Sequence, residues 1–86
     1  KKWRVVIFDI KEKRRNDRTK LRNFLKQLGL KRLQDSVWVY PYPIEEIITL
    51  IKSEFKLGSS LLYMIVDEIE YDTPIRKEFG LPITKN

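Results

Sequence analysis

The apolar positions of this chain follow two patterns, short unbroken runs and stripes at helical spacing. The segment from Lys2 to Ile10 holds the run Val5-Val-Ile-Phe8, which consists of β-branched and aromatic residues. Such a run is typical of a strand that is buried on both faces of a sheet, so we predict a central strand here. Leu61 to Val66 form a second run of this kind, and we predict a second strand buried on both faces.

Two stretches carry apolar residues at the spacing of an amphipathic helix. The first stripe consists of Leu21, Phe24, Leu25 and Leu28. We expect Asn16 or Asp17 to cap the start of this helix and Gly29 to end it. The second stripe consists of Ile44, Ile47, Ile48, Ile51 and Phe55. Pro43 suits the first turn of this second helix, and Gly58 is expected to close it.

The remaining segments complete the order of elements. Leu30 to Tyr40 predict either two short strands or one bent strand, with the bend near Asp35 and Ser36. Residues 72–86 form a C-terminal tail of uncertain role, in which Thr73 can cap a short turn of helix. The order predicts one α+β domain over residues 1–86, a ferredoxin-like split β-α-β sandwich whose antiparallel sheet carries two helices on one face.

Charge is distributed unevenly along the 86 residues, which carry a net charge of +6. Residues 1–35 hold 13 Lys or Arg and four Asp or Glu, whereas residues 36–86 hold five and eight. One basic region suits the phosphates of a nucleic acid better than a uniformly basic surface does. Arg18, Arg22 and Lys26 form a ridge on the first helix, because they are four residues apart. The alternative is a solvated helix face without a partner.

The chain has no cysteine and no histidine. Disulfides, thiolate nucleophiles and a histidine base are therefore excluded, and any metal must bind carboxylate oxygens, which favours Mg²⁺ or Mn²⁺. Asp9 is the candidate ligand, because it follows the first strand and faces a basic segment. The competing interpretation is that Asp9 caps a turn or pairs with a nearby arginine.

The longest apolar run is too short to span a bilayer. No signal peptide is visible, so we expect no membrane association and a cytoplasmic location. The chain starts without methionine and can be a fragment of a longer protein.

Three segments resemble a known family. They are similar to segments of the second CRISPR-associated (Cas) protein, the small ferredoxin-like partner of the CRISPR integrase. The three segments are Trp3-Arg-Val-Val-Ile-Phe-Asp-Ile10, Arg18-Thr-Lys-Leu-Arg-Asn-Phe-Leu25 and Leu33-Gln-Asp-Ser-Val-Trp38. Phe8 to Arg15 together with Leu33 to Pro41 resemble more closely the Cas-like central domain of the phenylacetate-operon repressor (PaaX) family. The resemblance covers about residues 3–66.

The resemblance implies a homodimer in which the two copies of Asp9 face each other and hold one divalent metal. Asp9 is then both the metal ligand and the catalytic residue of a metal-dependent endonuclease. Ser36 and Trp38 match the motif that follows the second strand. Arg15 and Arg18 match family arginines near the helix start, and we expect six basic residues to bind DNA or RNA: Arg14, Arg15, Arg18, Arg22, Lys26 and Arg32.

Two functions from different classes follow. The first is a dimeric nucleic-acid-binding protein of the CRISPR adaptation type, either a weak Mg²⁺- or Mn²⁺-dependent endonuclease of antiviral defence or a scaffold for the CRISPR integrase. The alternative is the dimerisation domain of a PaaX-type transcriptional regulator without catalytic activity. A plain protein-interaction domain, with its basic half docked onto an acidic protein, is the third possibility.

Overall fold

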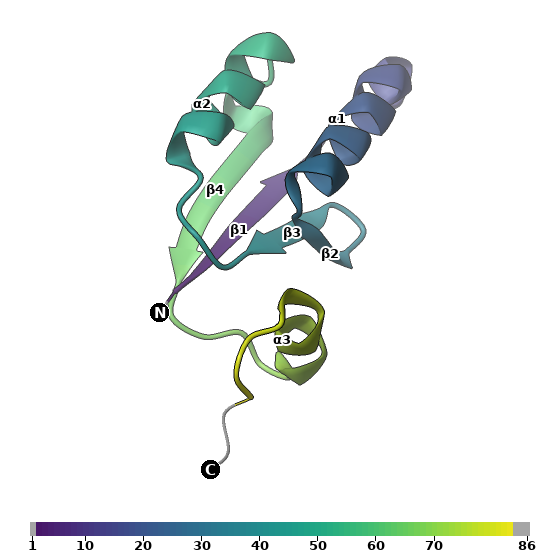
Figure 1. The fold of residues 1–86 in the computed structure, drawn as a ribbon. Helices are drawn as coiled ribbons and strands as arrows, with labels where there is room; N and C mark the ends of the chain where they lie inside the picture. The colour runs from purple at the N-terminus through teal and green to yellow at the C-terminus, as the bar shows by residue number, and fades with distance from the viewer. Residues whose placement is uncertain (1, 84–86) are drawn as a thin grey trace.

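An antiparallel sheet of four strands carries the other elements, and the computed structural model describes residues 2–83 of the chain (Figure 1). The strands are β1 (Trp3–Phe8), β2 (Lys31–Gln34), β3 (Val37–Tyr40) and β4 (Leu61–Val66). Their order across the sheet is β2-β3-β1-β4, and every neighbouring pair is antiparallel. β1 is therefore an interior strand, which confirms the prediction drawn from its unbroken apolar run.

Helices cover the two faces of the sheet unequally (Figure 1). The helices are α1 (Arg15–Leu28), α2 (Glu45–Glu54) and α3 (Thr73–Phe79), and two short 3-10 turns, η1 (Glu12–Arg14) and η2 (Gly58–Ser60), precede α1 and β4. α1 and α2 lie together on one face, whereas α3 packs on the opposite face. The α+β class and the pair of helices on one face are confirmed, and α3 adds a partial third layer.

The segment from Leu30 to Tyr40 forms two strands rather than one bent strand. β2 and β3 pair as a hairpin whose turn is Asp35–Ser36, and their register shifts between Arg32 and Gln34. Because β3 lies between β1 and β2, the unit β1-α1-β2 is split by a strand, as the predicted topology requires.

The face beneath α1 and α2 holds the larger core. Val6 and Phe8 of β1 are buried here against Leu21 and Leu25 of α1, together with Trp38 of β3. α2 adds Ile48 and Ile51 to this cluster. The predicted helical stripes thus supply the core residues of this face, since their apolar positions repeat at the period of the helix.

A smaller core lies on the other face, beneath α3. Trp3, Val5 and Val39 are buried there together with Ile75 of α3. The ring centroid of Phe79 lies 5.9 Å from that of Trp3, a distance typical of an aromatic pair. Residues of the predicted tail therefore belong to the packed fold, although residues 84–86 lie outside the described part of the chain.

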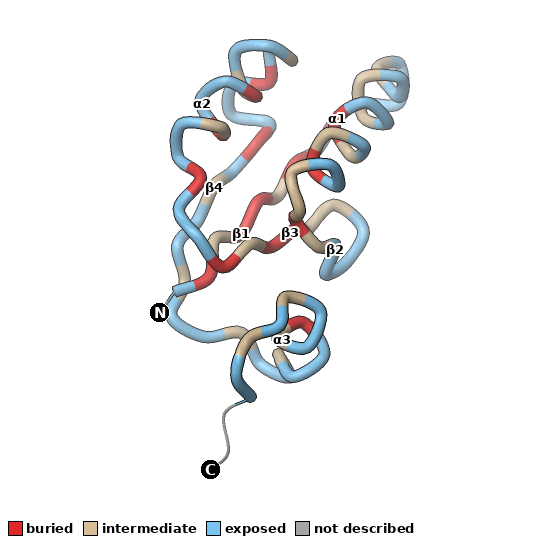
Figure 2. Tube along the Cα trace, in the orientation of Figure 1, coloured by how far each residue is buried: buried red, intermediate tan, exposed pale blue. Residues whose placement is uncertain are grey.

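The strand β4 corrects one prediction. It lies at the edge of the sheet, and it is not buried on both faces: the exposed fractions of Leu62, Met64 and Ile65 are 55%, 38% and 49%. Figure 2 shows the contrast, because β1 is drawn in the colours of buried and intermediate residues while much of β4 is pale blue. An apolar run alone does not distinguish an interior strand from an exposed edge strand.

The ends of α1 and α2 differ in part from the predictions. Gly29 ends α1 in the left-handed region at φ 100°, as predicted. The predicted cap at Asn16 or Asp17 is wrong, because η1 runs directly into α1 and Arg14 occupies the N-cap position. α2 begins at Glu45, after Pro43, and it ends at Glu54, before Gly58.

The start of α3 also differs from the prediction. Asp72 occupies the N-cap position without a side-chain cap, and Thr73 is the first helical residue. Within residues 2–83, no helix combines the length and the apolar character needed to cross a membrane.

Candidate functional site

Asp9 lies directly after β1 at the end of the sheet, where the chain enters the connection to α1. Its backbone N–H donates a hydrogen bond of 2.9 Å to the carbonyl oxygen of Ser60, which ties the end of β1 to the start of β4. The residue is exposed and lines a hollow of about 320 Å³ with Ser60 and Ile10. Asp9 therefore lies at the end of an interior strand, as the sequence predicted.

The other residues that line this hollow are cationic. Lys11, Lys13 and Arg14 all contribute to its wall. Positive charges next to a single carboxylate oppose the binding of a divalent cation, because the cation prefers several negative oxygen ligands. The described residues contain no group of three or more acidic, histidine or cysteine side chains close enough to hold a metal ion.

The residues of one chain therefore do not fit a bound metal ion. A Mg²⁺ or Mn²⁺ site would need Asp9 of a second copy, and each copy would bring its own cationic wall. The metal and catalytic roles of Asp9 stay predictions.

Two of the predicted nucleic-acid-binding arginines hold the connection between β1 and α1. Arg18 donates from Nη1 to the carbonyl oxygen of Ile10 at 3.2 Å and from Nη2 to Oε1 of Glu12 at 3.0 Å. Arg15 Nη1 lies 3.7 Å from Oε2 of the same glutamate. Glu12 thus bridges two arginines, and their charges are partly neutralised within the chain.

Arg14 and Arg32 also have partners in the chain. Arg14 donates to Oδ2 of Asp17 at 3.1 Å and to the carbonyl oxygen of Phe55 at 2.5 Å, so it links α1 to the end of α2. Arg32 donates to the carbonyl oxygen of Asp35 at 2.9 Å and closes the β2–β3 turn. Both arginines thus have a local structural role, which the spacing of charges along the sequence did not indicate.

Arg22 and Lys26 differ from the other four basic residues. Among the described residues neither has an ion pair, and Lys26 is exposed on α1. Nε of Arg22 is buried and has no hydrogen-bond partner in the described part of the chain. The predicted ridge of three charges is therefore reduced to these two residues as available phosphate contacts.

The motif residues Ser36 and Trp38 take structural positions. The carbonyl oxygen of Ser36 accepts a hydrogen bond of 3.3 Å from the N–H of Phe8, and Trp38 is 1% exposed in the larger core. The motif thus joins the β2–β3 hairpin to β1 and anchors β3. Sequence reasoning identified these positions through the resemblance, but it did not reveal that both serve the fold.

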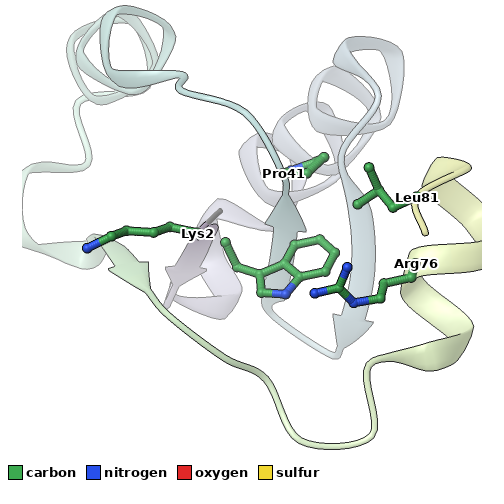
Figure 3. Close-up of a pocket in the computed structure, with 5 residues that line it drawn as sticks. Lys2, Pro41, Arg76 and Leu81 are labelled. Atoms are coloured by element: carbon green, nitrogen blue, oxygen red, sulfur yellow. The ribbon is translucent and has the colours of Figure 1, made fainter. Parts of the chain in front are cut away.

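A small niche beside Trp3 shows how α3 is fixed to the sheet (Figure 3). The guanidinium of Arg76 lies 5.8 Å from the centroid of the Trp3 ring, and its Nε donates to Oδ2 of Asp72 at 2.8 Å. Its Nη1 donates to the carbonyl oxygen of Pro82 at 3.1 Å. The niche has a volume of only about 20 Å³, room for about one water molecule, so we assign it to packing and not to a ligand.

The face that carries α3 is only half covered, a feature that the sequence did not reveal. Leu62 pairs with Ile7 and Met64 pairs with Val5, so these β4 side chains share the face of α3. Ile7 is partly buried and both β4 residues are exposed. α3 contacts β2, at the opposite edge of the sheet, so the apolar half at β4 stays open.

These features define a class: a small α+β domain with a half-covered antiparallel sheet, an isolated strand-end aspartate in a cationic hollow, and arginines that mostly serve the fold. Comparison with protein families matches residues 1–77 to the PaaX protein central Cas2-like domain. The chain therefore belongs to this family, as the resemblance of Phe8–Arg15 and Leu33–Pro41 predicted. Comparisons with curated proteins and with solved structures found no match.

Proposed function

We propose that this chain is a ferredoxin-like dimerisation domain of a PaaX-type transcriptional regulator and that it has no catalytic activity. The family match over residues 1–77 carries the proposal. In such a regulator the domain joins two copies, and the DNA-binding elements of the regulator then reach two half-sites of one operator. Two-fold protein symmetry and a palindromic operator match each other in this way.

The surroundings of Asp9 favour this role over a nuclease. Metal-assisted phosphodiester hydrolysis needs a cation held by several oxygen ligands and a way to activate water. Asp9 shares its hollow with Lys11, Lys13 and Arg14, and the chain has no histidine that could act as a base. Endonuclease activity, metal binding and a role in antiviral defence therefore receive no support from the geometry of this site.

The open apolar half of the sheet supports association of two copies. Leu62 and Met64 of β4 expose 55% and 38% of their surface on this face. Contiguous exposed apolar residues of this kind mark interaction surfaces in soluble domains. A domain of 86 residues also buries only roughly 60–65% of its unfolded surface, so association adds to its stability.

A dimerisation assay tests the proposed function directly. The chain is fused to a DNA-binding domain that occupies its operator only as a dimer, and repression of a reporter gene is measured. We expect repression that depends on the fused domain. A fusion that represses no better than the DNA-binding domain alone would contradict the proposal. Cleavage of RNA or DNA by the purified chain with Mn²⁺, abolished by Asp9→Asn, would favour the nuclease instead.

A second candidate is direct binding of nucleic acid by α1, which is favoured by Arg22 and Lys26 of the predicted ridge, since neither has an ion pair among the described residues. Because each phosphate contact releases about 0.9 counterion, Arg22→Ala in a dimer should flatten the log–log salt dependence of DNA binding by about two units. Arg18→Ala is the matched control, because Arg18 is held by Ile10 and Glu12. Equal slopes for wild type and Arg22→Ala would remove α1 from the binding surface.

A further inference from the structure

The two edges of the sheet are built differently. β2 is four residues long, it carries Lys31 and Arg32, and its register with β3 is irregular. Short length, charge and irregularity are devices by which proteins protect an edge strand from pairing with another chain. β2 therefore has the properties of a protected edge.

β4 lacks these protections. It pairs with β1 in an unbroken register over all six residues, and its sequence Leu-Leu-Tyr-Met-Ile-Val contains no charge, proline or glycine. Leu62 and Met64 are exposed on the α3 face, and Ile65, which pairs with Arg4, is exposed on the helix-covered face. An exposed and regular apolar edge is a template for the addition of another strand.

We propose that β4 pairs with β4 of a second copy in antiparallel orientation, so that two sheets join into one sheet of eight strands. The inference rests on the proposed function, because it names the surface through which two copies associate. A two-fold axis perpendicular to the sheet keeps each face continuous across the joint, since paired residues in antiparallel strands point to the same side. Leu62 and Met64 of both copies then lie together on the open half of the α3 face, which we call the open half-face, and cover one another.

Charge selects this edge and this orientation. Each copy carries +6, so two copies repel each other unless they meet at a neutral surface, and β4 is such a surface. Glu68 follows β4, as does Asp67, whose Oδ1 already lies 3.4 Å from Nζ of Lys2. Lys11 and Lys13 line the hollow beside Ser60, at the start of β4, so antiparallel pairing brings the end that carries Glu68 towards a basic end of the other copy. Two β2 strands would instead place lysines and arginines near one another, which is unfavourable.

The arrangement has a consequence for Asp9. With Met64 opposite Met64 of the second copy, strands about 4.8 Å apart and a rise of about 3.3 Å per residue, the two copies of Asp9 are about 30 Å apart, at opposite ends of the joint. They cannot share a metal ion at that separation. Pairing through β4 and a metal held between two copies of Asp9 are therefore mutually exclusive.

Sedimentation equilibrium of wild type, Ile65→Lys and Tyr42→Lys tests the proposal. Ile65 lies on the face opposite to the exposed Leu62 and Met64, so a lysine at this position disturbs pairing along the edge and not a face-to-face contact. Tyr42 is the control, because it is exposed and lies outside β4. We expect Ile65→Lys to weaken the dimer by about tenfold or more, because the charge enters a symmetric joint twice, and Tyr42→Lys to leave it unchanged. Circular dichroism checks that each variant is folded.

Single-cysteine variants supply a second readout, because the natural chain has no cysteine. Under mild oxidation we expect Met64→Cys to form a covalent dimer and Asp9→Cys to form none. Two results would overturn pairing through β4 and leave the proposed function intact. One is a dimer that Ile65→Lys does not weaken, and the other is a covalent dimer formed by Asp9→Cys and not by Met64→Cys. A wild type that is monomeric at high micromolar concentration would overturn both.

Discussion

The two faces of the sheet show how one layer of strands can serve two purposes. Under α1 and α2 the face is closed, and Leu61 of β4 is fully buried there, as are Val6 and Leu25. Under α3 the covering stops short of β4, where Leu62 is 55% exposed. The closed face stabilises a single copy, and the half-open face leaves apolar surface exposed, which we propose is covered by a second copy. Substitutions on the two faces should therefore separate folding from association.

The largest effect is expected for Leu25→Ala on the closed face. The side chain is fully buried between α1 and the sheet, so the substitution leaves a cavity and should lower the free energy of unfolding by about 3 kcal/mol. Urea denaturation at fixed protein concentration measures the loss. Leu50→Ala on the exposed side of α2 is the matched control, with an expected change within about 0.5 kcal/mol. Equal losses at the two leucines would contradict the description of the closed face.

A smaller effect is expected for Ile75→Ala, which weakens the contact of α3 with the other face. Ile75 is 7% exposed and sits in a short helix that can adjust, so we expect a loss of about 2 kcal/mol. Hydrogen exchange should accelerate in α3 and leave α1 protected, because the two helices belong to separate cores. Faster exchange of both helices by the same factor would show that the two faces unfold as one unit.

The position of β1 could be predicted from the sequence, whereas the position of β4 could not. Val5 to Phe8 and Leu61 to Val66 are similar apolar runs, yet the first is flanked by two strands and the second by one. The difference lies in the order of strands and in the reach of α3, which are tertiary features. The spacing of hydrophobic residues predicts a helix or strand and the buried side of a helix, but it does not indicate how many strands lie next to a given strand in the sheet.

The candidate site shows the same limit. The basic residues of the first half could be counted from the sequence, and the resemblance indicated the family correctly. The sequence did not reveal that Glu12 would hold Arg15 and Arg18, because that contact depends on the conformation of η1. Asp9 was located correctly at the end of β1 and next to a basic segment, whose Lys11, Lys13 and Arg14 line its hollow, but the hollow itself became apparent only in three dimensions.

On the open half-face, Leu62→Ser should leave folding nearly unchanged and weaken association. The side chain is more exposed than buried in a single copy, so we expect a change in the free energy of unfolding within about 0.5 kcal/mol, measured on dilute protein. The dissociation constant of the dimer should rise, because an apolar contact is lost twice. A variant that unfolds readily and still dimerises like wild type would reverse the assignment of the two faces.

The smallest effect concerns the link between β4 and α2. The Tyr63 hydroxyl donates a hydrogen bond of 2.7 Å to Oε2 of Glu45, and this bond is the main cause of the lowered pKa of that carboxyl. Burial, and then the same bond, raises the pKa of Tyr63. Tyr63→Phe should raise the pKa of Glu45 towards its ordinary value, which an NMR titration of the carboxyl carbon measures.

The direction of the pH dependence follows from the sign of that shift. Because the folded state lowers the pKa of Glu45, its contribution is present above the ordinary glutamate pKa and is lost as the pH falls through the folded value. The stability difference between wild type and Tyr63→Phe should accordingly shrink in acid. A Glu45 titration curve that is identical in both proteins would show that the bond does not form in solution.

The distance between the two copies of residue 9 tests the central claim most directly. Asp9→Cys carries a nitroxide spin label in an otherwise cysteine-free chain, and pulsed electron paramagnetic resonance measures the separation of the two labels. A non-catalytic domain joined through β4, with Met64 opposite Met64, predicts a separation of about 30 Å, broadened by the label arms. A narrow distribution below about 15 Å would place the two copies of residue 9 within reach of one shared metal ion and contradict the account.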